Sequence, residues 1–417
     1  MTRQPTENRF ADKAEVTALL GAFCLFLSAV EYMLPKPMPF MRLGIANLPI
    51  LLAVDLLPFP WFLVLALVKV VGMSVISGSL FSFIALFSLL GTLAAALAMW
   101  GVRKAGGRLV SQVGVSIVGA LASNGTQIFI ARYLVFGQAA WLIAPLFLAM
   151  GLATGAALGV FAEHFAQGSR WYALARGLPL AEAPEEAEPS ASRAAKAEKP
   201  AKAKKSNSQA RARRRQRFEA LFTPWSAAAG GAALAMIFLF ERNLAVKAGM
   251  FLFFMAAVTA AGKKFSFLTM VTVSAGIVLT NLLVPSGKVL ARLGPLAITQ
   301  FALVEGVVKA LTFEGLMLIS KASIMPGLKL PGRFGSIVAA SFIYYDRIVE
   351  YKGRIRAASL SRDADAMMRE VWESFGKEGS QSRAAGPASP AAPRARLGYA
   401  ILSACVLAAG LAALLAN

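Results

Sequence analysis

The chain alternates between long blocks of apolar residues and short polar breaks. An α-helix needs about 17–25 mainly apolar residues to cross the hydrocarbon core of a membrane. Six apolar blocks lie in the first part, covering residues 15–33, 48–57, 61–76, 80–102, 113–133 and 139–165, and all but the second approach or exceed that length. The second block, between Asn47 and Pro58, is short, so we expect it to begin within residues 42–46 or to enter obliquely. The pattern predicts a six-helix membrane module over residues 1–175.

A second set of apolar blocks follows further along the chain. It covers residues 226–240, 244–261, 265–283, 293–319 and 397–415. The mixed and basic stretch 324–378 precedes the last block, and we expect cytoplasmic helices there, including the short apolar run 334–345. The pattern therefore predicts an all-α, polytopic helical membrane protein with eleven spans, whose second module occupies residues 221–417.

Residues 176–220 have a different composition. From residue 181 to residue 218 the chain is rich in Ala, Lys, Pro and Arg, has almost no large apolar side chains, and ends in a run of arginines. Such a segment cannot bury a core. We expect a disordered basic linker in the cytoplasm that also contacts the anionic headgroups of membrane lipids.

Composition and charge support a membrane protein. Of the 417 residues, 57% are hydrophobic and 16% are charged, whereas soluble domains carry about 25% charged residues. The net charge is +21, and the basic residues lie between the apolar blocks and in the linker. We attribute this placement to membrane topology, in which cytoplasmic loops are rich in Lys and Arg, and expect no nucleic-acid partner. The basic residues that mark cytoplasmic turns are Arg3, Arg9, Lys13, Arg103, Lys104, Arg108, Arg170, Lys263, Lys264 and Lys321. They predict a multi-pass protein of the cell inner (cytoplasmic) membrane, with its N-terminus in the cytoplasm and its C-terminus outside.

The sequence holds no set of residues that predicts catalysis by this chain alone. It has no G-x-x-x-x-G-K-[ST] phosphate-binding loop, so we expect no ATP hydrolysis by that route. Its one histidine is His164, and its two cysteines, Cys24 and Cys405, lie in apolar segments without CxxC spacing. The nearest approach to an acidic magnesium site is Asp363 with Asp365, in a basic stretch. We therefore expect a protein that is not an enzyme and that uses no metal and no cofactor.

Polar residues inside the apolar segments form a candidate ligand site. Ionisable groups within a membrane are costly, and they usually line a cavity or pair with one another. On the predicted topology most of them lie in the outer half of the first module, where a Pro-rich loop could close over a polar ligand. The candidates are Glu31, Arg42, Asn47, Lys69, Ser77, Gly78, Ser79, Asn124 and Gln127. The alternative is that these groups bind one another within the bundle, with Glu31 paired to Lys69 or Arg42 and the amides holding helices together.

Two stripes of small residues occur at helical spacing. They are Ala14, Ala18 and Ala22 on the first helix and Gly151, Gly155 and Gly159 on the sixth. Small residues let helix backbones approach closely. We expect the glycines to pack within the bundle, whereas the alanines form either an internal packing face or a docking face for the second module.

A basic stretch in the cytoplasmic region offers a candidate contact with a partner. Its arginines are Arg354, Arg356 and Arg362. They could dock an acidic groove on a partner, or they could form the solvated face of a helix beside the lipid.

Several motifs of the first module resemble one known family. They are Glu31 before a Pro-rich loop, the run Arg42-Leu43-Gly44-Ile45-Ala46-Asn47, the run Gly78-Ser79-Leu80-Phe81-Ser82-Phe83, and the run Gly114-Val115-Ser116-Ile117-Val118-Gly119-Ala120 leading to Asn124 and Gln127. Over residues 16–165 the chain resembles the Gx transporter family, often labelled heptaprenyl diphosphate synthase component I. It departs from that family at Lys69, where Arg is usual, and at Ser123, where His is usual. Lys69 keeps the charge but lacks the planar fork of Arg.

The resemblance implies a function in transport. That family resembles the substrate-binding components of energy-coupling factor transporters, which are six-helix proteins that capture vitamins at an outward-facing site and carry an alanine stripe on the first helix. It implies a small vitamin-like or anionic ligand that contacts Glu31, Arg42, Asn47, Lys69 and Asn124.

The second module resembles the transmembrane coupling component of the same transporters. The resemblance lies in residues 294–299, the helix that follows to residue 320, and the basic region before a final span. It implies that separate cytoplasmic ATPase subunits bind within residues 347–369, with Arg354, Arg356 and Arg362 as candidate contacts. ATP-driven rocking of the first module would then release the ligand inside.

Two other functions stay open. The family label favours a membrane accessory subunit of polyprenyl (heptaprenyl) diphosphate synthesis. Because no acidic magnesium site is found, such a subunit could only assist a soluble partner. The third hypothesis is a membrane scaffold for a redox or lipid complex.

Overall fold

The computed structural model confirms a helical membrane protein. It describes residues 12–33, 44–177, 213–216, 218–263, 266–293, 296–325, 327–328, 330–351, 359–382 and 395–416. Nearly all regular structure in these residues is helical, and the exception is one small β-hairpin. Most of the expected linker, residues 178–212, lies outside the described residues, so the division into two modules stays a prediction.

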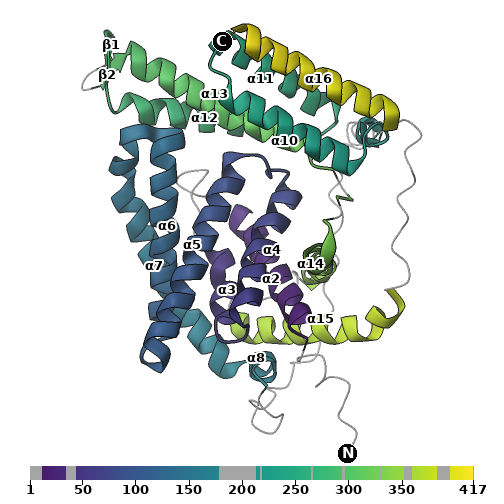
Figure 1. Cartoon of the computed structure of the whole chain (residues 1–417). Helices are drawn as coiled ribbons and strands as arrows, with labels where there is room; N and C mark the ends of the chain where they lie inside the picture. The colour runs from purple at the N-terminus through teal and green to yellow at the C-terminus, as the bar shows by residue number, and fades with distance from the viewer. Residues whose placement is uncertain are drawn as a thin grey trace, which may run out of the picture.

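The first half of the chain forms one bundle of helices (Figure 1). Its elements are α2 (Lys13–Met33), η1 (Ile45–Asn47), α3 (Leu48–Ala53), α4 (Phe59–Ser77), α5 (Phe83–Gly106), η2 (Gly107–Leu109), α6 (Gln112–Ala131), η3 (Arg132–Phe136), η4 (Gly137–Ala139), α7 (Ala140–Gly168) and α8 (Arg170–Ala175). The turn η3 is a π-helical turn that ends α6. Helices α6 and α7 pack along each other, and α5 packs on α6.

The expected second span is a short buried helix. α3 has 6 residues, which rise only about 9 Å along the axis, against the roughly 30 Å of a hydrocarbon core. Every residue from Leu48 to Ala53 is buried. The apolar character of this run therefore reflects burial in the bundle and not contact with lipid.

Four stretches of the described residues are long and apolar enough to cross a membrane. They are Lys13–Glu31, Phe59–Ser77, Phe83–Gly106 and Gln112–Gly168, the last of which contains both α6 and α7. Shorter apolar helices cover Pro224–Phe240, Leu244–Ala260, Phe267–Leu282 and Gly398–Ala412. The protein is thus polytopic, and its apolar helices differ in length more than the eleven predicted spans do.

Most helices of the second half of the chain form a layer around α13, whereas α14 and α15 pack on the first bundle. Its elements are α10 (Pro224–Phe240), α11 (Leu244–Ala260), α12 (Phe267–Leu282), β1 (Val289–Leu293), β2 (Leu296–Thr299), α13 (Gln300–Ser323), α14 (Gly332–Tyr351), α15 (Leu360–Ser382) and α16 (Ala395–Ala416). Helices α10, α11 and α12 each pack on α13, and α16 packs on α10 and α11. The helix expected from residue 293 begins only at Gln300, because β1 and β2 pair antiparallel just before it.

Two buried cores of the described residues join the two halves. In Figure 1, α4 to α7 run down the view, whereas α10 to α13 and α16 run across one end of them. One buried core joins the start of α5 and the end of α6 to α10, α11, α12 and α13. A second core joins α2, α3 and α4 to α14 and α15, so the cytoplasmic helices expected in residues 324–378 pack on the first bundle.

Candidate functional site

Lys69 is the centre of a polar cluster inside the first bundle. Its side chain is only 4% exposed on α4. The Lys69 ammonium donates to Asn47 Oδ1 and, at 3.4 Å, to Thr92 Oγ1 on α5. Glu31, which is also buried, accepts a 3.3 Å bond from the Ala46 N–H. The structure thus brings together the segment 44–47, α2, α4 and α5 around two charged candidates.

Backbone conformation places Asn47 beside Lys69. Gly44 has φ 83 and ψ 8, a left-handed conformation that a side chain would strain, and the turn η1 follows directly. Asn47 ends η1 and is the N-cap residue of α3, although its side chain makes no cap hydrogen bond. The Asn47 amide oxygen is therefore available to the ammonium of Lys69.

Gln127 extends this polar region to α6. Its Nε2 donates a 2.9 Å hydrogen bond to Ser123 Oγ one turn away. Gly91 of α5 leaves the space for this pair, since a Cβ there would lie 3.0 Å from Gln127 Nε2 and 3.1 Å from Ser123 Oγ. Gly91 directly precedes Thr92, so Gln127 and Lys69 approach neighbouring positions of α5.

Asn124 faces a different helix. Its Nδ2 donates a 2.8 Å hydrogen bond to the Phe147 carbonyl of α7. A Cβ at Gly151 would lie 2.2 Å from that nitrogen, so the amide fills the space that the glycine leaves. The amide of Asn124 therefore joins α6 to α7, as expected if the amides hold helices together instead of binding a ligand.

The segment Ser77, Gly78 and Ser79 lies against the second half of the chain. Gly78 has φ 64 and ends α4, and the two serine hydroxyls are 2.7 Å apart. The following Phe81 N–H donates a 3.0 Å hydrogen bond to Ser320 Oγ near the end of α13. A Cβ at Gly78 would lie 3.6 Å from the Lys321 Cα.

The alanine stripe lies on a helix that packs against the second half. Ala18 and Ala22 are fully buried, and Ala14 packs on the same core, which also contains residues of α14. At Gly21, a Cβ would lie 2.7 Å from Ser341 Oγ of α14 and 2.8 Å from Val68 Cγ1 of α4. Helix α2 is therefore in close contact with α14.

The remaining candidates are arginines. Arg42, Arg354 and Arg356 lie outside the described residues. Arg362 is exposed on the first turn of α15. The described residues contain no group of three or more His, Cys, Asp or Glu side chains that could hold a metal ion.

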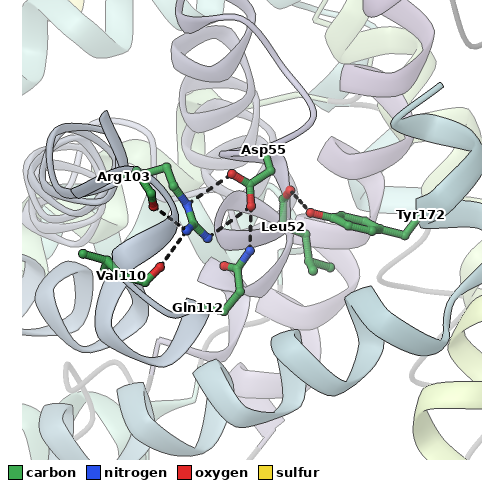
Figure 2. A network of polar contacts seen from close by, with 7 residues as sticks. Leu52, Asp55, Arg103, Val110, Gln112 and Tyr172 are labelled. Atoms are coloured by element: carbon green, nitrogen blue, oxygen red, sulfur yellow. Dashed lines mark hydrogen bonds and ion pairs between the residues drawn. The ribbon is translucent and has the colours of Figure 1, made fainter. Parts of the chain in front are cut away.

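Figure 2 shows a second polar network that the sequence did not predict. Asp55, in the turn after α3, forms an ion pair with Arg103 of α5, whose Nε lies 3.1 Å from Oδ1. Gln112, at the start of α6, donates a 2.7 Å hydrogen bond to the same carboxylate. Arg103 also donates to the Val110 carbonyl at 2.7 Å. The network ties the ends of α3, α5 and α6 together on the side that the basic residues predict to be cytoplasmic.

Tyr172 of α8 lies beside this network. Its hydroxyl is 3.4 Å from the Leu52 carbonyl of α3 (Figure 2). Burial raises the pKa of the Tyr172 phenol well above its ordinary value, and the Asp55 carboxylate raises it further. The phenol therefore stays neutral and remains a hydrogen-bond donor over the physiological pH range.

Two family models match separate parts of the chain. The family described as heptaprenyl diphosphate synthase component I matches residues 20–165. A domain of unknown function, DUF8519, matches residues 225–325. No curated protein and no solved structure matches the chain. The first match supports the family label that the motifs of the first bundle suggested.

Proposed function

We propose that this chain is a membrane subunit of an energy-coupling factor type uptake transporter. Its first bundle would capture a small vitamin-like or anionic nutrient from outside the cell inner membrane. Its second half would couple that bundle to separate cytoplasmic ATPase subunits. The proposed ligand contacts are Lys69, Asn47, Glu31 and Gln127, together with Arg42.

The buried ammonium of Lys69 carries this proposal. A lysine at the centre of a membrane helix costs at least about 2.5 kcal/mol, so such residues usually have a functional role. Lys69 lies on a stretch that is apolar enough to span the membrane, and its ammonium reaches Asn47 and Thr92 at the centre of the polar cluster. An ammonium at this position can bind an anionic group of a ligand through a charge-assisted hydrogen bond, which is stronger than a bond between neutral groups.

The contact between α13 and the loop after α4 supports the coupling step. The basic residues predict that Gly78 faces outside and that Lys321 faces the cytoplasm. In the structure, however, Gly78 lies next to Lys321, and Phe81 bonds to Ser320. If the first bundle tilts in the membrane, the loop after α4 and the end of α13 can lie on the same side of the membrane. This arrangement supports a rocking motion that carries a bound ligand inward.

Native mass spectrometry of the gently purified protein tests the ligand site. We expect the wild-type protein to retain a small molecule and Lys69→Met to lose it. The matched control is Lys247→Met, because Lys247 is equally buried on α11 and donates a 3.1 Å bond to a threonine, Thr312. A ligand retained equally by all three proteins would remove Lys69 from the site and contradict the proposal.

The family match favours a second function. Its description names component I of a heptaprenyl diphosphate synthase, which implies a partner subunit. This chain would then hold a lipid diphosphate for a soluble synthase. Prenyl product that forms only when both proteins are present, with no ATPase subunit in the purified complex, would support this function over transport.

A further inference from the structure

Asp365 of α15 binds the start of α8. Its side chain is only 8% exposed. The carboxylate accepts a hydrogen bond from Ser169 Oγ and a 3.0 Å bond from the Trp171 N–H. Ser169 is the N-cap residue of α8, and its hydroxyl accepts from the Tyr172 N–H at 3.0 Å. The Asp365 carboxylate thus satisfies the Trp171 amide and Ser169 satisfies the Tyr172 amide at the start of α8, where a negative charge is favoured.

The apolar face of α15 packs on the same part of the first bundle. Met367, Met368, Val371 and Trp372 are buried in the core that also holds Trp171 and Tyr172. Arg369, one turn after Asp365, lies 3.3 Å from its carboxylate and fixes it from the α15 side. α15 and α8 are therefore joined by buried apolar contacts and by charge-assisted hydrogen bonds, which are the stronger kind.

α8 in turn contacts the helix that leads to the candidate ligand site. The Tyr172 hydroxyl donates to the Leu52 carbonyl of α3, and the ring is almost fully buried (Figure 2). α3 begins directly after Asn47, its N-cap residue. Asn47 accepts from the ammonium of Lys69. α3 is only 6 residues long, so a displacement at Leu52 reaches Asn47 through little more than one helical turn.

We propose that α8 is a mechanical link between the cytoplasmic helix α15 and the ligand cluster. Asp365 acts as a positioning residue that holds α8. Tyr172 transmits that position to α3, and α3 sets where Asn47 lies relative to Lys69. The inference rests on the proposed function, because it takes the ligand site as given. A movement of α15 would open that site through α8 and α3.

Amide hydrogen exchange of the full chain in lipid nanodiscs tests this link without a ligand. The variant Asp365→Asn keeps the shape of the side chain but removes its charge. We expect exchange to rise roughly tenfold in α8 and in α3, because α8 loses a charge-assisted bond and α3 then loses the support that α8 gives it through Tyr172. The matched control is Glu373→Gln, an equal change of charge at an exposed position of α15. We expect it to leave exchange in α8 and α3 unchanged.

A second variant tests the order of the contacts within the link and separates a local effect from general unfolding. Tyr172→Phe should raise exchange in α3 but not at the start of α8, because it breaks only the later contact. Exchange in α5 and α13 should stay at the wild-type level in every variant. The proposal is overturned if Asp365→Asn loosens α8 while α3 keeps its protection, or if it loosens neither helix.

The outcome is separable from that of the proposed function. Should Asp365→Asn loosen α3 while Lys69→Met still retains the small molecule, the link stands and the ligand site is wrong. If Lys69→Met loses the molecule while Asp365→Asn leaves amide exchange in α3 unchanged, the ligand site stands and the link is wrong.

Discussion

Asp55 and Arg103 form an ion pair that is mostly shielded from water. Arg103 is 19% exposed and Asp55 is 22% exposed. Removing one partner of such a pair leaves the other charge poorly solvated, and this usually costs more than the pair itself contributes. Gln112 and the Val110 carbonyl share the same network, so its loss affects α3, α5 and α6 together.

We predict that Asp55→Ala lowers the free energy of unfolding by roughly 3 kcal/mol. A matched surface control is Glu219→Ala, because Glu219 pairs with Arg215 at sites that are 30% and 51% exposed. This control should lower the free energy of unfolding by less than about 1 kcal/mol. Chemical unfolding of both variants in the same detergent measures the difference. Equal losses would contradict a structural role for the Asp55 network.

Tyr172 gives a prediction for alkaline pH. Because the folded protein raises the pKa of this phenol, folding favours its neutral form. The associated stability is fully present below the unfolded pKa of about 10, and it is lost as the pH rises above that value. We expect Tyr172→Phe to be less stable than the wild type at neutral pH and to approach it at high pH. Thermal unfolding at several pH values checks this, and a constant difference would contradict it.

Composition and helical spacing identified most of the polar residues inside the first bundle, but not their partners. Lys69, Glu31 and Gln127 were recognisable because each interrupts an apolar block. Asp55 was not, because its partners lie 48 and 57 residues further along the chain. Asp365 was seen only as part of a weak acidic pair, since its contact with Ser169 spans 196 residues. Contacts of this range depend on the tertiary fold and leave no local pattern.

At the scale of single elements, α6 and α7 show why small residues recur at helical spacing. Three glycines of α7 pack within the bundle, as the sequence predicted; in the structure they face α6, and each one leaves space for a different α6 residue. A Cβ at Gly155 would lie 2.9 Å from Ala120 Cβ, and one at Gly159 would lie 2.5 Å from Val113 Cα. The second contact is with backbone, which cannot rotate away.

We predict that Gly159→Ala destabilises the protein by about 1–3 kcal/mol, because the added methyl group forces α6 and α7 apart. The control is Gly125→Ala on α6, where an added Cβ meets nothing within 4 Å. There the change should be neutral or stabilising by up to about 1 kcal/mol, since alanine favours a helix. Thermal unfolding of the two variants separates these outcomes, and similar losses would argue against close packing at Gly159.

Two elements departed from the hydrophobic pattern for physical reasons. An apolar run of ten residues or so is compatible with a buried helix or with part of a span, and periodicity alone cannot separate them. α3 is the buried case, because neighbouring helices cover it on all sides. β1 and β2 occupy residues that look like the start of an apolar helix, but α13 begins only after Thr299, whose backbone is extended.

At the scale of the whole molecule, the second half of the chain holds the first bundle at both ends and along one side. α14 packs along α2, and α15 binds α8 at the end that we predict to be cytoplasmic. At the opposite end, Asn281 of α12 donates a 3.1 Å bond to the Val135 carbonyl of the π turn, and Ser320 accepts from Phe81. A bundle held in this way can change its orientation only if some of these contacts break.

The contact at Phe81 is one that a rocking motion must break. In the proposed cycle the loop after α4 faces outside when ligand binds, so it must leave the end of α13. The double variant Phe81→Cys with Ser320→Cys should form a disulfide on oxidation, because the Phe81 N–H lies 3.0 Å from Ser320 Oγ. The background should carry Cys24→Ser and Cys405→Ser, which removes both native thiols.

We predict that oxidation of this double variant blocks uptake of whichever small molecule the wild-type protein retains, and that a reductant restores it. Uptake into membrane vesicles measures the effect, and each single-cysteine variant controls for the oxidant. The physical reason is that the disulfide fixes the first bundle in the arrangement of this structure, with the loop after α4 against α13. Undiminished uptake by fully crosslinked protein would mean that Phe81 and Ser320 stay together throughout transport, and the rocking step would have to be abandoned.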